Sequence, residues 1–244
     1  MNILPKILIF SFILGFSTQS TNAETCFELE KDKGIQMKRL EIAKTKIFEQ
    51  DTLSLKTIKD KYLQKVVNIQ EKTSDRTVEL QIIIEDLKSL PGNSETVANT
   101  IQTLSDQISL YVEKTDHSLV SFSSGVDKIL DDKSKAIKNA VQQYEIGTIQ
   151  LYDKALTSCK KIGSYDEEEF ALEMKIAQKR VLDTEKNSKR ILQGIDSLYA
   201  TLSLELDDSD NALNLVLKSI QVSLLENPPE DLKPLSLFRL WRML

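Results

Sequence analysis

Leu90-Pro91-Gly92-Asn93-Ser94 and Ile162-Gly163-Ser164-Tyr165 are the two stretches that decide the fold of this chain. Each contains glycine, and the first also contains proline. Both residues end helices, because proline lacks a backbone donor and glycine readily leaves helical geometry. Proline-free segments with apolar residues at helical spacing flank each stretch. The two breaks therefore predict three long helices, at about residues 27–90, 94–160 and 164–226.

A narrow apolar row, here called the seam, runs along one side of each predicted helix. Residues three and four apart lie on one helix face, and a row that continues over many turns is typical of helices that pack against helices. Arg76 is a polar member of the first row. Its apolar members are Phe48, Leu55, Tyr62, Ile69, Ile83 and Leu90.

Short connections force consecutive helices to run antiparallel. Because a helix rises 1.5 Å per residue, some 64 residues would make a rod roughly 95 Å long. We therefore expect an all-α fold over residues 24–227, an elongated antiparallel three-helix bundle or coiled coil of long helices. A second layout stays open, in which the helices break near residues 118–125 and 207–211 and fold into a shorter bundle.

Two local signals mark a helix start and a weak point. Ser164, with Glu167 three residues later, matches a capping box, which predicts that the third helix begins there. The second helix contains Ser123, Ser124 and Gly125, which are poor helix formers, so we expect a kink or hinge at these residues.

The composition fits a long helical protein better than a compact enzyme. The 244 residues include 7 glycines and 5 prolines, and aromatic residues make up only 6 %. These fractions are low for a loop-rich domain with a bulky core. The formal net charge is −5, and no basic patch is interleaved with aromatic residues. We therefore expect no nucleic-acid partner.

The N-terminus has the pattern of a secretory signal peptide. Lys6 precedes an apolar run at residues 7–16, and small residues lead to Ala23. This run is about half of the roughly 20 apolar residues that a membrane-spanning helix needs. The sequence predicts a signal peptide at residues 1–23, cleavage after Ala23, and a secreted, periplasmic or otherwise extracytoplasmic protein.

The two cysteines, Cys26 and Cys159, are expected to form a disulfide. If the first turn centres near residue 92, antiparallel partners have numbers that add to about 184, and these two add to 185. Exported proteins commonly contain disulfides. Lipid attachment at Cys26 is the poorer interpretation, because Glu24 and Thr25 precede it.

No residue pattern indicates catalysis or metal binding. The one histidine, His117, lies in a serine-rich stretch without a nucleophile motif, and we expect it to be exposed. Asp207, Ser209 and Asn211 match the first ligands of a calcium loop, but alanine and lysine occupy the positions that need glycine and glutamate. We expect no enzyme activity, no cofactor and no metal site.

Residues 228–244 form a proline-containing linker and an apolar C-terminal tail. The tail holds the only tryptophan of the chain. It is expected either to cover an end of the bundle or to dock on a partner protein or, weakly, on a membrane surface. The residues of this docking candidate are Leu237, Phe238, Leu240, Trp241 and Leu244.

These features favour a non-enzymatic exported scaffold, adaptor or spacer, for example in a cell-envelope or secretion assembly. Its partner would be another extracytoplasmic protein, or a second copy of the chain bound through the helices. The alternatives are a periplasmic holdase-type chaperone, which would use the seams near the hinge as a clamp, and a membrane-acting helical protein. No motif selects one of these, and analogy at the level of fold is a weak argument.

Overall fold

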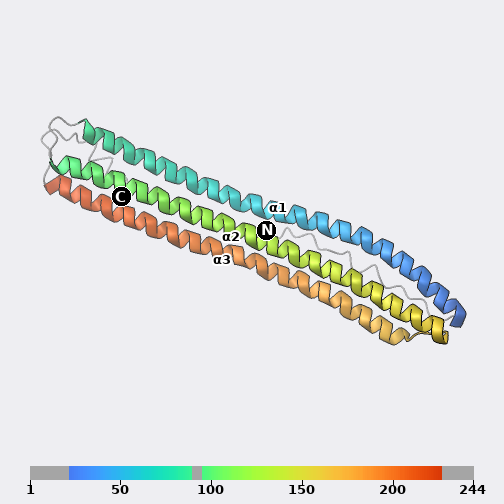
Figure 1. The fold of residues 1–244 in the computed structure, drawn as a ribbon. Coiled ribbons are helices and arrows are strands. Elements are labelled where there is room, and N and C mark those ends of the chain that lie inside the picture. Colours follow the sequence, from blue (N-terminus) through green and yellow to red (C-terminus); the bar gives the residue numbers. More distant parts are fainter. Residues whose placement is uncertain (1–21, 90–94, 227–244) are drawn as a thin grey trace. The chain divides into compact units, whose positions relative to one another are not determined.

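A computed structural model describes residues 22–89 and 95–226 of the chain. Within these ranges the chain forms three helices and no strand: α1, Asn22–Lys88; α2, Glu95–Ile162; and α3, Glu167–Glu226 (Figure 1). The predicted all-α helical bundle is confirmed, and the predicted helix ends lie within five residues of the observed ones. The elongated rod stays a prediction. None of the described helices combines the length and the apolar character that crossing a membrane requires.

The described residues pack as two compact units, and each helix contributes one part to each unit. Unit 1 contains the residues up to Lys56 together with Asp131–Ile191. Unit 2 contains Thr57–Leu130 together with the residues from Leu192 onward. Every contact described below lies within one of these units.

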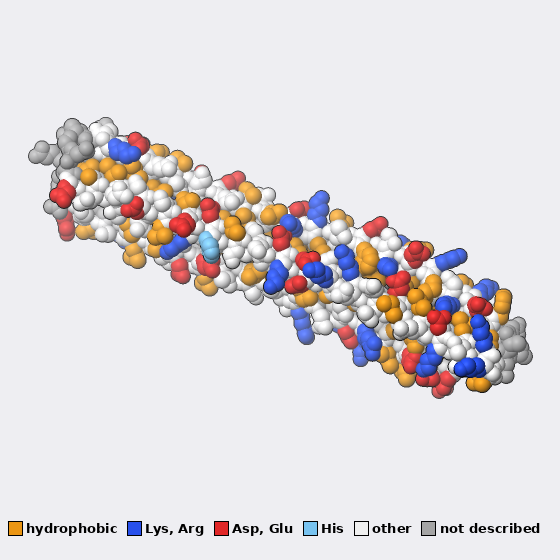
Figure 2. All heavy atoms as spheres, in the orientation of Figure 1, with side chains coloured by type: hydrophobic (Ala, Val, Ile, Leu, Met, Phe, Trp, Pro, Cys, Tyr) orange, Lys and Arg blue, Asp and Glu red, His pale blue; other side chains and the backbone are white. Residues whose placement is uncertain are grey.

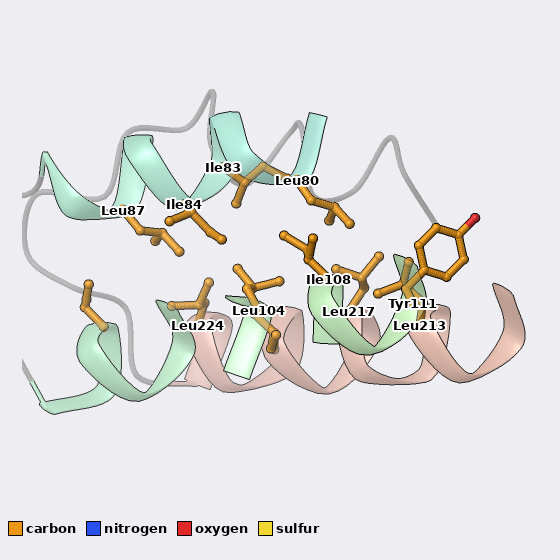
Figure 3. Close-up of a cluster of buried hydrophobic side chains, with 12 residues drawn as sticks. Leu80, Ile83, Ile84, Leu87, Leu104, Ile108, Tyr111, Leu213, Leu217 and Leu224 are labelled. Carbon is orange, nitrogen blue, oxygen red and sulfur yellow. The ribbon is translucent and has the colours of Figure 1, made fainter. Parts of the chain in front are cut away.

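Unit 2 has a core of leucine, isoleucine and valine side chains from all three helices (Figure 3). Burying one such side chain stabilises the folded state by about 1.5–3 kcal/mol. Ile83 belongs to the predicted seam of the first helix, whereas Ile84 and Leu217 were not foreseen. The side chains of unit 2 with no exposed surface are Leu80, Ile83, Leu87, Leu104, Ile195, Leu217 and Leu224.

The contacts in unit 2 fix the directions of its helices. Tyr62 packs against Phe122, with 6.0 Å between ring centroids, while the earlier Lys59 pairs with the later Asp127, so α1 and α2 run antiparallel. Tyr62 and Arg76 bind aspartates that each lie 134 residues further along, on α3. A constant offset of this kind shows that α1 and α3 run parallel in this unit.

Unit 1 is less deeply packed on its α1 side. Leu29 is buried, but Phe48 and Leu55, which the seam places in the core, are only half-buried. Ion pairs between Lys33 and Asp153, at 2.5 Å, and between Lys44 and Glu145, at 2.6 Å, bridge α1 and α2. The buried members of its core cluster are Leu29, Tyr152, Ala155, Phe170 and Met174.

The layout in which the helices break is wrong, because α2 continues through residues 118–125 and α3 through residues 207–211. The weak helix formers in α2 are interspersed with Leu119, Phe122 and Val126, which are all buried. Packing of these apolar residues outweighs the low helix propensity of the serines. Whether the chain bends at Ser123–Gly125 is untested, so the hinge stays a prediction.

Gly125 has a packing role in unit 2. A Cβ atom at this position would lie 2.7 Å from Cδ1 of Leu198 on α3. One turn away, a Cβ on Gly194 of α3 would lie 3.2 Å from Cδ1 of Ile129 on α2. Each helix thus has a glycine where the other helix presents a large side chain, which lets α2 and α3 approach closely.

The connection between α2 and α3 corrects the predicted capping box. Gly163 has a positive φ of 76°, and its N–H donates to the Cys159 carbonyl at 2.8 Å, which ends α2. The capping residue of α3 is Asp166, whose Oδ1 accepts from the Glu169 N–H at 2.9 Å. Ser164 therefore lies in the turn before the helix. The helix begins at Glu167 because Asp166 directly precedes it and accepts a hydrogen bond from one of its free backbone N–H groups.

Replacing glycines by alanine separates packing from helix propensity. Gly147→Ala is expected to stabilise the protein by about 0.5–1 kcal/mol, because nothing lies within 4 Å of the added Cβ and alanine favours the helix. Gly125→Ala is expected to give no such stabilisation, because the added Cβ would displace the Leu198 side chain. Urea unfolding followed by far-ultraviolet circular dichroism measures both. Equal stabilisation by the two substitutions would contradict the close approach of α2 and α3.

Candidate interaction site

The two cysteines meet in unit 1. Cys26 of α1 and Cys159 of α2 form a disulfide, with 5.7 Å between their Cα atoms. This separation is usual for bonded cysteines. The pairing that the antiparallel register predicts is therefore present in the structure, and it attaches the first turns of α1 to the last turns of α2.

Tyr152 anchors the packing of unit 1. Its ring is 1 % exposed and meets Phe170 edge-on, with 5.0 Å between centroids. Its hydroxyl donates to Oδ2 of Asp32 at 2.5 Å. Burial, and then the bond to Asp32, raise the pKa of Tyr152 above its ordinary value. The phenol is thus held neutral as a donor that links α2 to α1.

A buried ion pair joins α1 and α2 in unit 1. Nζ of Lys133 contacts Oδ1 of Asp51, and each side chain is 8 % exposed. This pair was not predicted from the sequence, although the two residue numbers add to 184, as the rule that matched the cysteines requires. Two buried charges need one another because desolvation penalises either one alone. The pair therefore constrains how the two helices align.

A groove in unit 1 is too small for an organic substrate. Its volume is about 30 Å³, close to the space of one water molecule. The hydroxyl of Thr148 lines it, with no hydrogen-bond partner among the described residues. The remaining lining is largely apolar side chains and lysine and arginine stems, including Leu40, Ile47, Tyr144 and Met174. The groove therefore provides no reaction chamber.

Three aromatic rings form the corresponding anchor of unit 2. Tyr62, Phe122 and Tyr199, one from each helix, lie 5.9–6.5 Å apart between centroids. The Tyr62 hydroxyl donates to Oδ1 of Asp196 at 2.7 Å. Nζ of Lys65 lies 3.5 Å from the centroid of the Tyr199 ring, which places a cation over an aromatic face. These contacts hold the three helices together by both packing and polar bonds.

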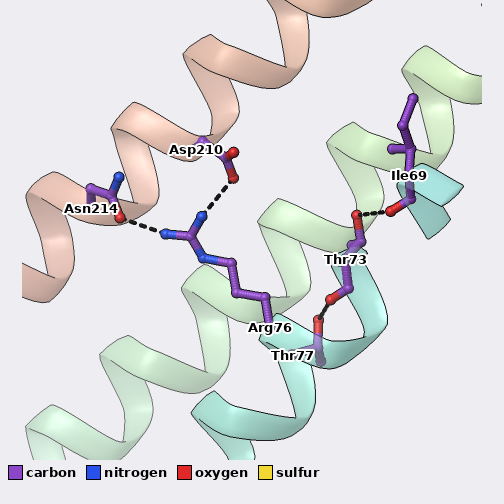
Figure 4. Close-up of polar contacts among 6 residues, drawn as sticks. All are labelled: Ile69, Thr73, Arg76, Thr77, Asp210 and Asn214. Atoms are coloured by element: carbon purple, nitrogen blue, oxygen red, sulfur yellow. Dashed lines mark hydrogen bonds and ion pairs between the residues drawn. The ribbon is translucent and has the colours of Figure 1, made fainter. Parts of the chain in front are cut away.

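Arg76, the polar member of the first seam, has a partner on α3 (Figure 4). Its Nη1 donates to Oδ1 of Asp210 at 2.8 Å, and its Nη2 donates to Oδ1 of Asn214 at 2.5 Å. Asp210 belongs to the acidic stretch that resembles part of a calcium loop, and here it serves helix pairing. No group of three or more possible metal ligands is present among the described residues.

Large apolar side chains also reach the surface, among charged ones (Figure 2). On α1 they follow one another at steps of 7, 11, 10, 4, 11 and 4 residues from Ile35 to Ile82, which keeps them on one broad face of the helix. Val78 and Ile82 are each two residues from the buried Leu80, or about 200° around the helix. We call this face the outer stripe of α1; its residues are Ile35, Ile42, Leu53, Leu63, Val67, Val78 and Ile82.

A second group of exposed apolar residues lies on α3. Their exposed fractions reach 67 % for Leu215 and 66 % for Leu204. Single exposed apolar residues are normal, but ordered rows of them mark surfaces that bind other proteins. The members on α3 are Leu172, Ile176, Leu182, Leu204, Leu215, Val222 and Leu225.

The structure does not bring the predicted functional residues into one site. His117 is exposed, as expected, and so is Ser124, while Ser123 and Gly125 are partly buried. The docking candidate in the tail, Leu237–Leu244, and most of the predicted signal peptide lie outside the described residues. α1 begins at Asn22, so cleavage after Ala23 would remove its first two residues.

Comparison of the chain with protein-family models, with curated proteins and with solved structures finds no match. Function is therefore inferred from the surfaces and from the residues that shape them.

Breaking the buried ion pair is expected to destabilise the protein. Lys133→Met leaves Asp51 charged and without its partner, which should cost about 3–5 kcal/mol. Adding Asp51→Leu should recover most of this loss, since apolar residues then pack in place of both charges. Urea unfolding measures both changes.

The matched control for this experiment is Lys135→Met, because the Lys135–Asp131 pair is exposed. This substitution should change stability by less than about 0.5 kcal/mol. If Lys133→Met unfolded no more readily than Lys135→Met, the interhelical pair would have no structural role.

Stability should fall at alkaline pH through Tyr62. Burial, followed by the bond to Asp196, raises its pKa from 10.0 to about 12. An unfolded chain ionises this tyrosine near pH 10, so its contribution to stability is complete below pH 10 and is lost as pH rises toward 12. Urea midpoints measured from pH 8 to 12 should drop less steeply in Tyr62→Phe. Identical slopes would show that Tyr62 ionises as freely as in the unfolded chain.

Proposed function

We propose that this chain is a non-enzymatic scaffold or adaptor that acts outside the cytoplasm and presents helical faces to another protein. The observation that carries the proposal is the ordered exposure of apolar side chains on α1 and α3. The disulfide supports an oxidising compartment, as the predicted signal peptide does. The small groove and the pairing of buried charges between helices support a structural role over catalysis.

The apolar tail extends this proposal, since it would be the anchor for the partner. Interfaces take most of their binding energy from a few large residues, and tryptophan is prominent among them. Trp241 would fill a pocket on the partner, with Leu237 and Leu240 beside it. The helical units would then set the distance and orientation of the bound protein.

The test is cross-linking of the protein in its source cells, without reductant, followed by mass spectrometry and binding measurements with the identified partner. Trp241→Ala should weaken binding by about 30-fold or more, and deletion of residues 235–244 should abolish it, with helicity unchanged. The matched control is Arg239→Ala, a polar change in the same segment. Full binding by the deletion variant would remove the tail from the proposal.

A holdase-type chaperone is the second candidate, and the exposed apolar residues on α1 and α3 favour it. It would bind unfolded clients without preference for one of them. Cross-links spread over many proteins, together with suppressed aggregation of an unfolded client at near-equal ratio, would support this candidate over the adaptor.

A further inference from the structure

The α3 helix of unit 2 carries a row of exposed apolar side chains. Its members follow one another at steps of 11, 7 and 3 residues, which places them on one side of the helix. The buried Leu213 and Leu224 lie on the opposite side, toward the core of unit 2. Each member of the row is more than half exposed. We call this row the α3 face; its residues are Leu204, Leu215, Val222 and Leu225.

The surroundings of the α3 face are acidic. Residues 192–226, the described α3 segment of unit 2, contain six aspartate or glutamate residues but only one lysine and no arginine. Asp207 and Asp208 are exposed, lie on the same side of the helix as the row, and form no ion pair with another described residue. The last turn of α3 has no basic residue either, although the carbonyl end of a helix attracts cations. A second copy of this face would therefore be repelled, and a basic apolar segment would be attracted.

The tail, residues 235–244, has the complementary composition. It contains two arginines, Arg239 and Arg242, and no acidic side chain. Its apolar residues recur at positions i, i+3, i+4 and i+7, the spacing with which a helix presents its anchors to a binding surface. These anchors are Leu237, Leu240, Trp241 and Leu244.

The chain beyond α3 is long enough to bring the tail back to the α3 face. α3 ends at Glu226, and residues 227–234 connect it to the tail. These eight residues span about 27 Å when extended, whereas Leu215 lies about 17 Å before Glu226 along the helix axis. A ten-residue tail helix would be about 15 Å long, which is close to the axial distance from Leu215 to Leu204. The tail can therefore run antiparallel along α3 without help from another molecule.

We propose that the tail docks on the α3 face of its own chain, with its arginines near Asp207 and Asp208 and with Trp241 among the exposed leucines. This inference rests on the proposed adaptor function, because it gives the anchor of the partner a second binding surface. A docked tail covers Trp241, so a partner binds only those molecules whose tail is released. The apparent affinity for the partner falls by the same factor as the released fraction. The contact is thus an intramolecular inhibitor of partner binding.

Trp241 reports this contact directly, because it is the only tryptophan of the chain. In the purified full chain its fluorescence should lie at shorter wavelength than that of free tryptophan amide and should be poorly quenched by acrylamide. Leu204→Ser combined with Leu215→Ser should shift docking about 100-fold toward the released tail and make Trp241 readily quenched. The matched control is Leu172→Ser combined with Leu182→Ser, two exposed leucines of α3 in unit 1, which should leave Trp241 protected.

Charge reversal separates this docking from general apolar adhesion. Asp207→Lys with Asp208→Lys should release the tail, and Arg239→Glu with Arg242→Glu should do the same. All four changes combined in one chain should restore the protection of Trp241, since opposite charges then face one another again. Circular dichroism should report unchanged helicity, because both aspartates are exposed. Free quenching of Trp241 in the unaltered protein, or failure of the combined variant to restore protection, would overturn the inference.

Dilution and partner binding complete the test. The protection of Trp241 should be independent of protein concentration, and protection that disappeared on dilution would place the tail on a second copy and overturn the intramolecular contact. The Leu204→Ser, Leu215→Ser variant should bind the partner more tightly than the unaltered protein does. A freely quenched Trp241 would leave the adaptor proposal standing. Full partner binding after deletion of residues 235–244, with Trp241 protected in the intact chain, would remove the tail from the adaptor proposal and leave the docked tail.

Discussion

The register between α1 and α2 is the constraint on which both units depend. An apolar seam repeats every seven residues, so sliding one helix by a heptad would preserve most of its apolar contacts. The polar partners do not repeat in this way. A slide of seven residues would place Lys133 opposite Lys44 or Ile58 in place of Asp51, leaving a buried charge repelled or unpaired. The disulfide fixes the same register covalently in unit 1.

Polar groups inside the two units therefore contribute more to specificity than to stability. The Asp51–Lys133 pair loses hydration when it is buried, and apolar residues of similar size would hold the helices almost as firmly. Arg76 likewise replaces an apolar residue in the seam and binds two side chains on α3. These residues select one alignment among several that the apolar seams alone would allow.

Much of this architecture could be read from the sequence because its signals are local. Gly163 ends α2 for a reason contained in its own backbone, and the seams repeat over many turns. The cysteine pairing followed from counting residues outward from a turn. Predictions that depended on competition between effects were less successful. Ser164 looked like a cap, but Asp166 lies closer to the free backbone donors of α3, and burial of Phe122 keeps α2 helical through its serines.

The surfaces were the part that sequence reasoning missed. A search for one apolar row per helix assigns α1 a single buried face, although α1 has apolar residues on two opposite faces. Which of two rows is buried depends on the neighbouring helices, and a single helix pattern does not contain that information. Gly125 was interpreted as a weak point for the same reason, because the close approach of Leu198 is visible only in three dimensions.

The disulfide has a mechanical consequence for the scaffold function that we propose. Cys26 and Cys159 are 133 residues apart in sequence, and tension applied at Cys26 passes through the covalent bond directly to the end of α2. The intervening loop is thereby shielded from load. Fully extended, that loop would span on the order of 450 Å, and none of this length can be drawn out while the bond is intact. Oxidation thus fixes the length of this segment under load, whereas after reduction the same segment would lengthen if load unfolded its helices.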